Sequence, residues 1–167
     1  MSKIIEQIES GLDNNVFTAA TIHVVHEGEV FLSDAFGVLD PRDPERTTSI
    51  ESLFDLASLT KVFVATSFMR LAEEGAINID DKVETIIPEF KGRDKDTITF
   101  RRLLSHLSGL PASSNLYEHG EWYQGKDVVL KKLFNTDLVY ATGTQVVYSC
   151  LGFMILGTAM ERITGQG

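Results

Sequence analysis

Strand-forming patterns in this sequence are confined to residues 1–45, and the apolar patterns that follow have helical spacing. β-Branched residues are frequent in Ala19–His26, a turn signal follows at Glu27-Gly28-Glu29, and an apolar run resumes over Val30–Phe36. This order predicts a β-hairpin. Because a hairpin alone is at best marginally stable in water, its apolar face must be covered by other parts of the fold. With the helical patterns that follow, we expect a domain of the α/β (α+β) class.

The amino-terminal segment predicts a surface helix with one buried stripe. Its apolar residues recur at helical spacing after a serine that can cap the helix, and they are Ile4, Ile5, Ile8 and Leu12. We expect Gly11 and the run Asp13-Asn14-Asn15 to stop this helix. The proline-marked charged loop Asp40–Pro44 then separates the terminal helix and hairpin, residues 1–45, from a mainly helical lobe, residues 46–167.

Two segments of the helical lobe are strongly apolar. Between Ser58 and Glu74, apolar side chains surround most of the helix axis, so we expect this helix to be largely buried and to close at Gly75. A second apolar helix is predicted over Leu151–Ile163, ending at Thr164-Gly165.

Shorter elements should connect these two helices. A short helix is predicted to start at Asp80–Val83 and to be limited by Pro88. Thr99 can cap another that runs through Leu104. Residues 111–124 have little periodicity and predict an irregular loop that could border a cleft.

The composition limits the classes of partner. The 167 residues carry a formal net charge of −9, from 15 basic and 24 acidic side chains. Such a chain repels a nucleic-acid backbone and an anionic membrane, so neither is expected as a partner. No apolar stretch approaches the roughly 18 residues that span a bilayer, and the amino terminus lacks the apolar run of a secretory signal. We therefore expect a cytoplasmic protein with no membrane span.

Neither a metal nor another cofactor is expected. Cys150 is the only cysteine, so no intrachain disulfide can form, and zinc would have to be bound without the usual cysteine cluster. His23 and His26 lie three apart on a predicted strand and point to opposite faces, which favours structural histidines over ligands. The sequence also lacks a glycine-rich phosphate loop.

Ser58 and Lys61 are the first candidates for catalysis. They are three residues apart at the start of a predicted helix, so both side chains lie on one face. A serine hydroxyl needs a neighbour that takes its proton, and a lysine can do so if its pKa falls toward neutrality. Burial and the positive end of the helix dipole disfavour the ammonium, so we expect a lowered pKa for Lys61. Taken alone, the spacing is better explained by a capping serine and a solvated lysine.

The context of this pair resembles a known family. Leu53–Lys61, followed by Leu71–Gly75 and Ile79–Val83, is similar to the serine-x-x-lysine region of the penicillin-recognising serine hydrolases. That family comprises serine β-lactamases, D-alanyl-D-alanine peptidases and related esterases. Leu103–Pro111 is similar to a loop of its class C β-lactamase and esterase branch. The resemblance implies a β-lactamase/transpeptidase-like fold, in which an antiparallel sheet is flanked by helices and accompanied by a helical lobe.

A second motif of the family is a tyrosine, a small residue and usually an asparagine, and Tyr148-Ser149-Cys150 matches it with one departure. By this resemblance Ser58 is the nucleophile, Lys61 its base, and Tyr148 a group that shuttles protons to the leaving group. Cys150 would be a substrate-binding residue that stands where asparagine is common. Because a thiol is a weaker donor and acceptor than an amide, this departure puts the binding of amide substrates in doubt.

Two residues invite other catalytic interpretations. Cys150 could be a nucleophile, but a lone thiol at the start of an apolar helix is more often a small buried hydrophobe. His106 invites comparison with a serine–histidine triad, but the family does not use it as a base. We interpret His106 as a hydrogen-bonded loop histidine.

The third motif of the family, a strand with lysine or histidine that ends in glycine and lines the oxyanion hole, has no match up to Gly167. The resemblance therefore covers nearly all of residues 1–167 but implies an incomplete β-lactamase-like domain, without the carboxy-terminal strands. We expect the isolated chain to be weakly active or inactive, to aggregate, or to need a partner, such as another copy or the remaining part of the domain.

These observations predict a serine hydrolase that forms a covalent acyl-enzyme with an ester or amide. The substrate could be a β-lactam, a D-Ala-D-Ala peptide or a carboxylic ester. The alternative is a catalytically inactive, truncated or split family member that acts as a binding or assembly protein.

Overall fold

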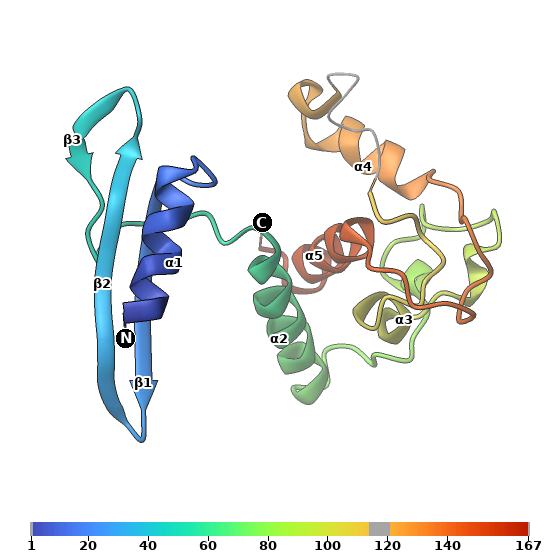
Figure 1. Cartoon of the computed structure of the whole chain (residues 1–167). Coiled ribbons are helices and arrows are strands. Elements are labelled where there is room, and N and C mark those ends of the chain that lie inside the picture. Colours follow the sequence, from blue (N-terminus) through green and yellow to red (C-terminus); the bar gives the residue numbers. More distant parts are fainter. Residues whose placement is uncertain (1, 114–120, 167) are drawn as a thin grey trace. The chain divides into compact units, whose positions relative to one another are not determined.

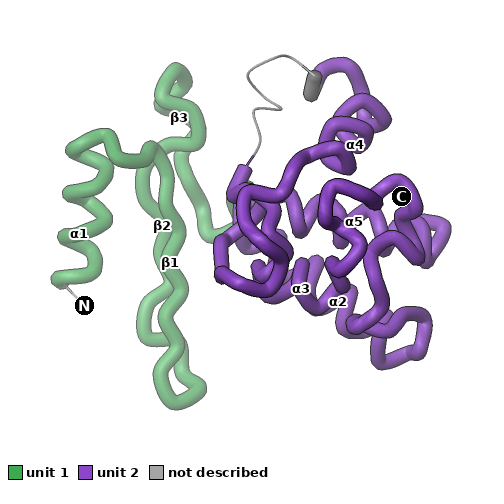
Figure 2. Tube along the Cα trace, turned by 90° about the vertical axis from the view of Figure 1, so that its right-hand side faces the viewer, with its two compact units in different colours: residues 1–55 green, residues 56–167 purple. Residues whose placement is uncertain are grey.

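The computed structural model describes residues 2–113 and 121–166 and divides into two compact units, Met1–Asp55 and Leu56–Gly167 (Figure 2). The first unit contains the sheet, and the second is helical. The charged segment expected to be a loop instead holds a turn at Pro41-Arg42 and the start of a further strand. That strand lies at the edge of its sheet, where a proline such as Pro44 is tolerated.

The first unit is a three-stranded antiparallel sheet with one helix (Figure 1). Strands β1 (Ala19–His26), β2 (Glu29–Asp40) and β3 (Asp43–Thr47) follow one another in the order β1-β2-β3. Helix α1 (Ser2–Asp13) contacts β2. The predicted hairpin is therefore confirmed, and the sheet gains a third strand that the sequence analysis did not predict.

The hairpin turn explains why the two strands pair in this register. Glu27 and Gly28 both have positive φ, 50° and 85°, which is the backbone of the tight turns that match strand twist. His23 and His26 are exposed on β1, and His23 Nδ1 lies 3.1 Å from Ser33 Oγ across the pair. This contact fits the structural interpretation of His23.

Helix α1 ends where the sequence predicts, at Asp13, and three of the four residues of its expected stripe are partly buried. Ile5, Ile8 and Leu12 are half-buried. Ile4 is exposed. The helix continues past Gly11 and ends at Asp13, the first residue of the predicted stop Asp13-Asn14-Asn15. A Cβ at Gly11 would lie 2.5 Å from the Phe17 ring, so the glycine is needed for close approach of that ring rather than for termination.

Helix α5 (Cys150–Thr164) organises the second unit. It contacts both α2 (Thr60–Glu73) and α3 (Phe100–Leu104), and the three helices are drawn together in Figure 1. Ser149 caps its start by accepting from Gly152 N, and Gly165 ends it in the left-handed region. The predicted second apolar helix is thus confirmed. The most deeply buried apolar residues around it are Phe68, Val83, Ile87, Phe90, Ile98, Phe100, Leu103, Leu110, Leu133, Leu151, Ile155, Leu156 and Ala159.

The expectation that the helix after Ser58 is largely buried is wrong. Phe68 is the buried residue of α2, whereas Val62 and Phe63 remain 61% and 62% exposed. Helix α2 packs against α5 along one side. Apolar residues on its other sides become buried only if another element packs against them, and the sequence of the helix does not provide that element.

The connecting elements agree with the sequence only in part. Thr99 caps α3 by accepting from Arg102 N, as expected. The short helix predicted to start at Asp80–Val83 and to be limited by Pro88 is a single 3₁₀ turn, Val83–Thr85. Of the predicted loop 111–124, residues 114–120 lie outside the described part of the chain, and Glu121–Gln124 forms another 3₁₀ turn. Across residues 2–113 and 121–166, no helix is long and apolar enough to cross a membrane.

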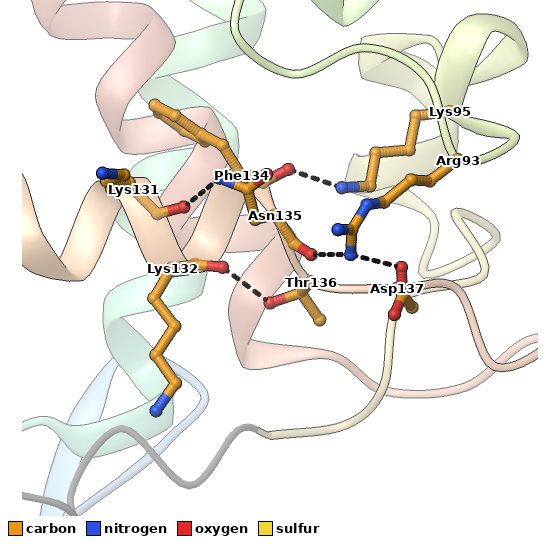
Figure 3. A network of polar contacts seen from close by, with 8 residues as sticks. All are labelled: Arg93, Lys95, Lys131, Lys132, Phe134, Asn135, Thr136 and Asp137. Atoms are coloured by element: carbon orange, nitrogen blue, oxygen red, sulfur yellow. Dashed lines mark hydrogen bonds and ion pairs between the residues drawn. The ribbon is translucent and has the colours of Figure 1, made fainter.

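Helix α4 (Lys126–Phe134) was not predicted, and two basic side chains cap its end (Figure 3). The last carbonyls of a helix have no partner within it. Here the buried Lys95 donates Nζ–H to the carbonyl of Phe134, and Arg93 donates to the carbonyl of Asn135 at 2.9 Å. Arg93 also pairs with Asp137 at 2.7 Å. Burial lowers the pKa of Lys95, and the positive charge of Arg93 lowers it further.

Replacing Lys95 with methionine should lower the free energy of unfolding by about 1–3 kcal/mol, because the apolar stem is kept but the Phe134 carbonyl loses its donor. Urea unfolding followed by circular dichroism measures this loss. Lys91→Met, at an exposed lysine of the same loop, is the control and should stay within about 0.5 kcal/mol of the parent. Equal stabilities for the two variants would rule out the capping role.

Candidate active site

Ser58 lies in an exposed 3₁₀ turn, Ala57–Leu59, that leads directly into α2. Ala57, immediately before it, has a φ of 44°, in the left-handed region that an alanine rarely adopts. Such strain persists only where the surrounding structure enforces it, and it is often found at functional sites. Ser58 therefore sits at a strained junction at the amino-terminal end of α2.

The three residues of the predicted catalytic group come together. The Tyr148 hydroxyl donates to Ser58 Oγ at 2.7 Å, although the two residues are 90 positions apart. Lys61 Nζ donates to Ser58 Oγ at 3.5 Å and lies 4.8 Å from the centre of the Tyr148 ring. One hydroxyl thus has both a phenol and an ammonium within reach.

Tyr148 is held by the segment Ser105–Ala112, which we call the scaffold loop. Ser149 Oγ donates to Pro111 O at 2.7 Å, and Cys150 N donates to Ala112 O at 2.9 Å. Gly109, also in the scaffold loop, accepts at its carbonyl oxygen from Val139 N at 2.9 Å. The family-like stretch Leu103–Pro111 therefore acts by positioning the tyrosine motif.

Gly109 is required in this loop. Its φ is 92°, and a Cβ added there would lie 2.5 Å from the carbonyl oxygen of Tyr140. No L side chain fits that backbone and that contact together.

The charges at the site differ from the sequence expectation in one respect. The pKa of Lys61 is raised, not lowered, because its hydrogen bond to Tyr148 favours the ammonium more than burial disfavours it, and a contact with Cys150 adds to the rise. The same hydrogen bond, followed by that with Ser58, lowers the pKa of Tyr148. The expected lowering of the Lys61 pKa was wrong because it considered only the helix end and burial, whereas the hydrogen bond to Tyr148 has the larger effect.

Cys150 is half-buried at the first position of α5. Its side chain contributes to the raised pKa of Lys61 through a hydrogen bond, so the thiol faces the same group as Tyr148. This places Cys150 beside the candidate pair, where the family resemblance implied a substrate-binding residue.

Two aromatic residues at the site were not assigned to it from the sequence. The His106 ring lies 4.8 Å from the Tyr148 ring and 5.2 Å from that of Phe153, between centroids. Lys61 Nζ lies 5.9 Å from the centre of the Phe153 ring. The interpretation of His106 as a hydrogen-bonded loop histidine is confirmed, since its Nδ1 accepts from Ser149 N at 3.0 Å. Within residues 2–113 and 121–166, no three His, Cys, Asp or Glu side chains are grouped to hold a metal ion.

Comparison with known proteins identifies the class of protein that has this fold and site. A family model described as Beta-lactamase matches residues 4–167, so the chain belongs to the β-lactamase family. Over 99% of its length it is 32% identical to the N-acetylmuramyl-L-alanine amidase of Bacillus subtilis (strain 168), of which it covers 42%. Both names denote hydrolases, in agreement with the predicted class.

Solved structures give the same fold. A putative β-lactamase from Bacteroides dorei DSM 17855 aligns with 99% of the chain at a TM-score of 0.77 and 25% identity, and 46% of that protein is covered. An octameric penicillin-binding protein homologue from Pyrococcus abyssi aligns with 99% at a TM-score of 0.83 and 24% identity, with 40% covered. The predicted fold class is thus confirmed, and the chain spans less than half the length of these relatives.

Replacing Lys61 with methionine should raise the pKa of Tyr148, because the larger of the two hydrogen bonds that lower it is removed. Ser58→Ala should raise it less, since it removes the smaller one. Spectrophotometric titration of tyrosinate measures both effects, with Tyr148→Phe identifying the transition. An unchanged tyrosine transition in Lys61→Met would contradict the arrangement of the site.

Proposed function

We propose that this protein is a serine hydrolase that forms an acyl-enzyme on Ser58. The observation that carries the proposal is the 2.7 Å hydrogen bond between the Tyr148 hydroxyl and Ser58 Oγ, with Lys61 beside both groups. A nucleophile and a proton acceptor at hydrogen-bond distance, with a third group to orient the acceptor, are what nucleophilic catalysis requires.

The pKa directions suggest how the roles divide. The raised pKa of Lys61 favours its ammonium form, and the lowered pKa of Tyr148 favours its phenolate form. We therefore assign proton acceptance to the Tyr148 phenolate, and we assign to Lys61 the stabilisation of that phenolate. This differs from the sequence-based role of Lys61 as the base itself. Lys61 then acts as the fixed positive charge that keeps the phenolate available.

In the acylation step, Ser58 Oγ bonds to the carbonyl carbon of an ester or amide while its proton passes to Tyr148. The tetrahedral intermediate collapses as the carbon–leaving-group bond breaks, and Tyr148 returns the proton to the leaving group. Water then attacks the acyl-enzyme by the reverse sequence, which releases the acid and restores Ser58.

The substrate class is a carboxylic ester, a β-lactam or a D-Ala-D-Ala peptide. The thiol of Cys150 at the Lys61 side of the site favours esters, because a thiol is a weak partner for an amide group. The similarity of the chain to the amidase of Bacillus subtilis supports amides as substrates as well.

A second candidate is a binding or assembly protein that has lost catalysis. The exposed apolar residues Leu59, Val62 and Phe63 favour it, because monomeric proteins rarely expose large apolar side chains side by side. Another copy of the chain, or the remaining part of a β-lactamase-like domain, would be the partner.

Intact-mass spectrometry after incubation with a fluorophosphonate, and separately with a fluorescent penicillin, tests the first proposal. We expect a single adduct that Ser58→Ala abolishes and that Ser67→Ala, at an exposed serine of α2, leaves in place. Tyr148→Phe and Lys61→Met should slow labelling by about 10²–10⁴-fold. A folded chain that gives no adduct with either probe would favour the binding protein.

Cys150 is proposed to tune the site rather than to attack. Cys150→Ala should therefore retain the Ser58 adduct. Cys150→Asn should raise labelling by the penicillin relative to the fluorophosphonate, because an amide side chain can donate to and accept from an amide substrate. The ratio of the two labelling rates on each variant is the measurement, and loss of the adduct in Cys150→Ala would reverse the assignment.

A further inference from the structure

His106 touches the tyrosine motif on both sides of Tyr148. Its carbonyl oxygen accepts from Val147 N at 3.0 Å, and its ring Nδ1 accepts from Ser149 N at 3.0 Å. The residues immediately before and after Tyr148 are thus tied to one histidine. The ring itself lies against the Tyr148 ring, at 4.8 Å between centroids.

The backbone at His106 makes this double contact possible. Its φ is 58°, in the left-handed region. Histidine adopts this region less readily than asparagine or glycine, and the contacts with Val147 and Ser149 offset that cost.

The contact with Ser149 fixes the protonation state of the ring. A backbone N–H is always a donor, so Nδ1 must carry a lone pair, and the neutral ring must hold its proton on Nε2. A doubly protonated ring would place an N–H against the N–H of Ser149 and lose this contact.

The surroundings of the ring also favour the neutral state. Burial lowers the pKa of His106, and the charge of Lys61 on α2 lowers it further. The segment before α5 presents the titratable Tyr148 to the ring, and α5 presents the uncharged Phe153. Cys150, also on α5, contacts Lys61.

We propose that His106 is a positioning residue for the reaction on Ser58: as a neutral Nε2–H ring it holds Tyr148 at Ser58, and its protonation releases the tyrosine and switches the site off in acid. The proposal rests on the proposed function for its catalytic consequence but not for its geometry.

The sign of the pH effect follows from the direction of the shift. Because the folded state lowers the pKa of His106, the contribution of the neutral ring is complete above its unfolded value of about 6.5. It is lost as the pH falls through the lowered pKa of the folded state. The switch therefore acts on the acid side of neutrality.

Nuclear magnetic resonance of the ¹⁵N-labelled full chain tests the geometry without any substrate. Imidazole spectra should give the Nε2–H tautomer for His106 at neutral pH, and the Ser149 amide signal should shift with the ionisation of the His106 ring. His106→Asn assigns the ring among the histidines. An Nδ1–H tautomer, or a Ser149 amide that ignores the titration, would overturn the proposal.

The rate of Ser58 labelling by the fluorophosphonate tests the consequence. In this reaction Ser58 Oγ bonds to phosphorus, fluoride leaves, and the serine proton passes to Tyr148. His106→Gly accepts the positive φ but offers no acceptor to Ser149, so labelling should fall by about tenfold. His106→Asn also accepts that φ, offers Oδ1 to Ser149 and does not titrate.

We expect His106→Asn to restore most of the rate lost in His106→Gly and to lack the step in the pH profile that follows the ionisation of His106, while the decline due to protonation of Tyr148 remains. A His106→Asn variant as slow as His106→Gly, or one whose pH profile is the same as that of the parent, would overturn the positioning role, with circular dichroism confirming that each variant is folded. If the parent chain shows no Ser58 adduct, the proposed function fails, and the resonance experiment still decides the geometry of His106.

Discussion

The candidate site depends on the attachment of the scaffold loop, Ser105–Ala112, to the residues that precede α5. Ser58 and Lys61 are brought together by local helix geometry, but Tyr148 is distant in sequence and has to be placed by other contacts. Backbone and side-chain hydrogen bonds from Ser149 and Cys150 to the scaffold loop provide that placement. The proposed chemistry therefore depends on a polar attachment between two loops rather than on the apolar core alone.

Much of this arrangement could be predicted from the sequence because motif residues act through local rules. The spacing of Ser58 and Lys61 puts them on one face, and Ser149 is a helix-capping residue directly before an apolar helix. The pairing of Tyr148 with Ser58 came only from family resemblance, because no local pattern specifies a contact over 90 positions. The predictions from sequence agree with the structure where they rest on local helix geometry, as for Ser58 and Lys61, or on a specific family motif, as for Tyr148.

The predictions that failed share a dependence on tertiary contacts. Apolar residues surround α2, yet its burial depends on what packs against it, and α5 covers one side. Helix α4 was overlooked, although Val129, Leu133 and Phe134 are buried at helical spacing after Asp127. The raised pKa of Lys61 likewise depends on Tyr148, a partner outside its own helix.

Gly109 shows how far the requirements of such a site extend beyond its reactive groups. A Cβ at Gly109 would lie 2.5 Å from the carbonyl oxygen of Tyr140, so there is no room for a methyl group. Tyr140 belongs to the stretch of chain that leads to Tyr148. A substitution of Gly109 would shift the backbone that positions Tyr148 and so slow the reaction, although every reactive atom would still be present. In sequence comparisons or mutational scans, such a position would look catalytic although it carries no functional group. Only the geometry of the loop distinguishes a glycine required by the backbone from a residue that takes part in the reaction.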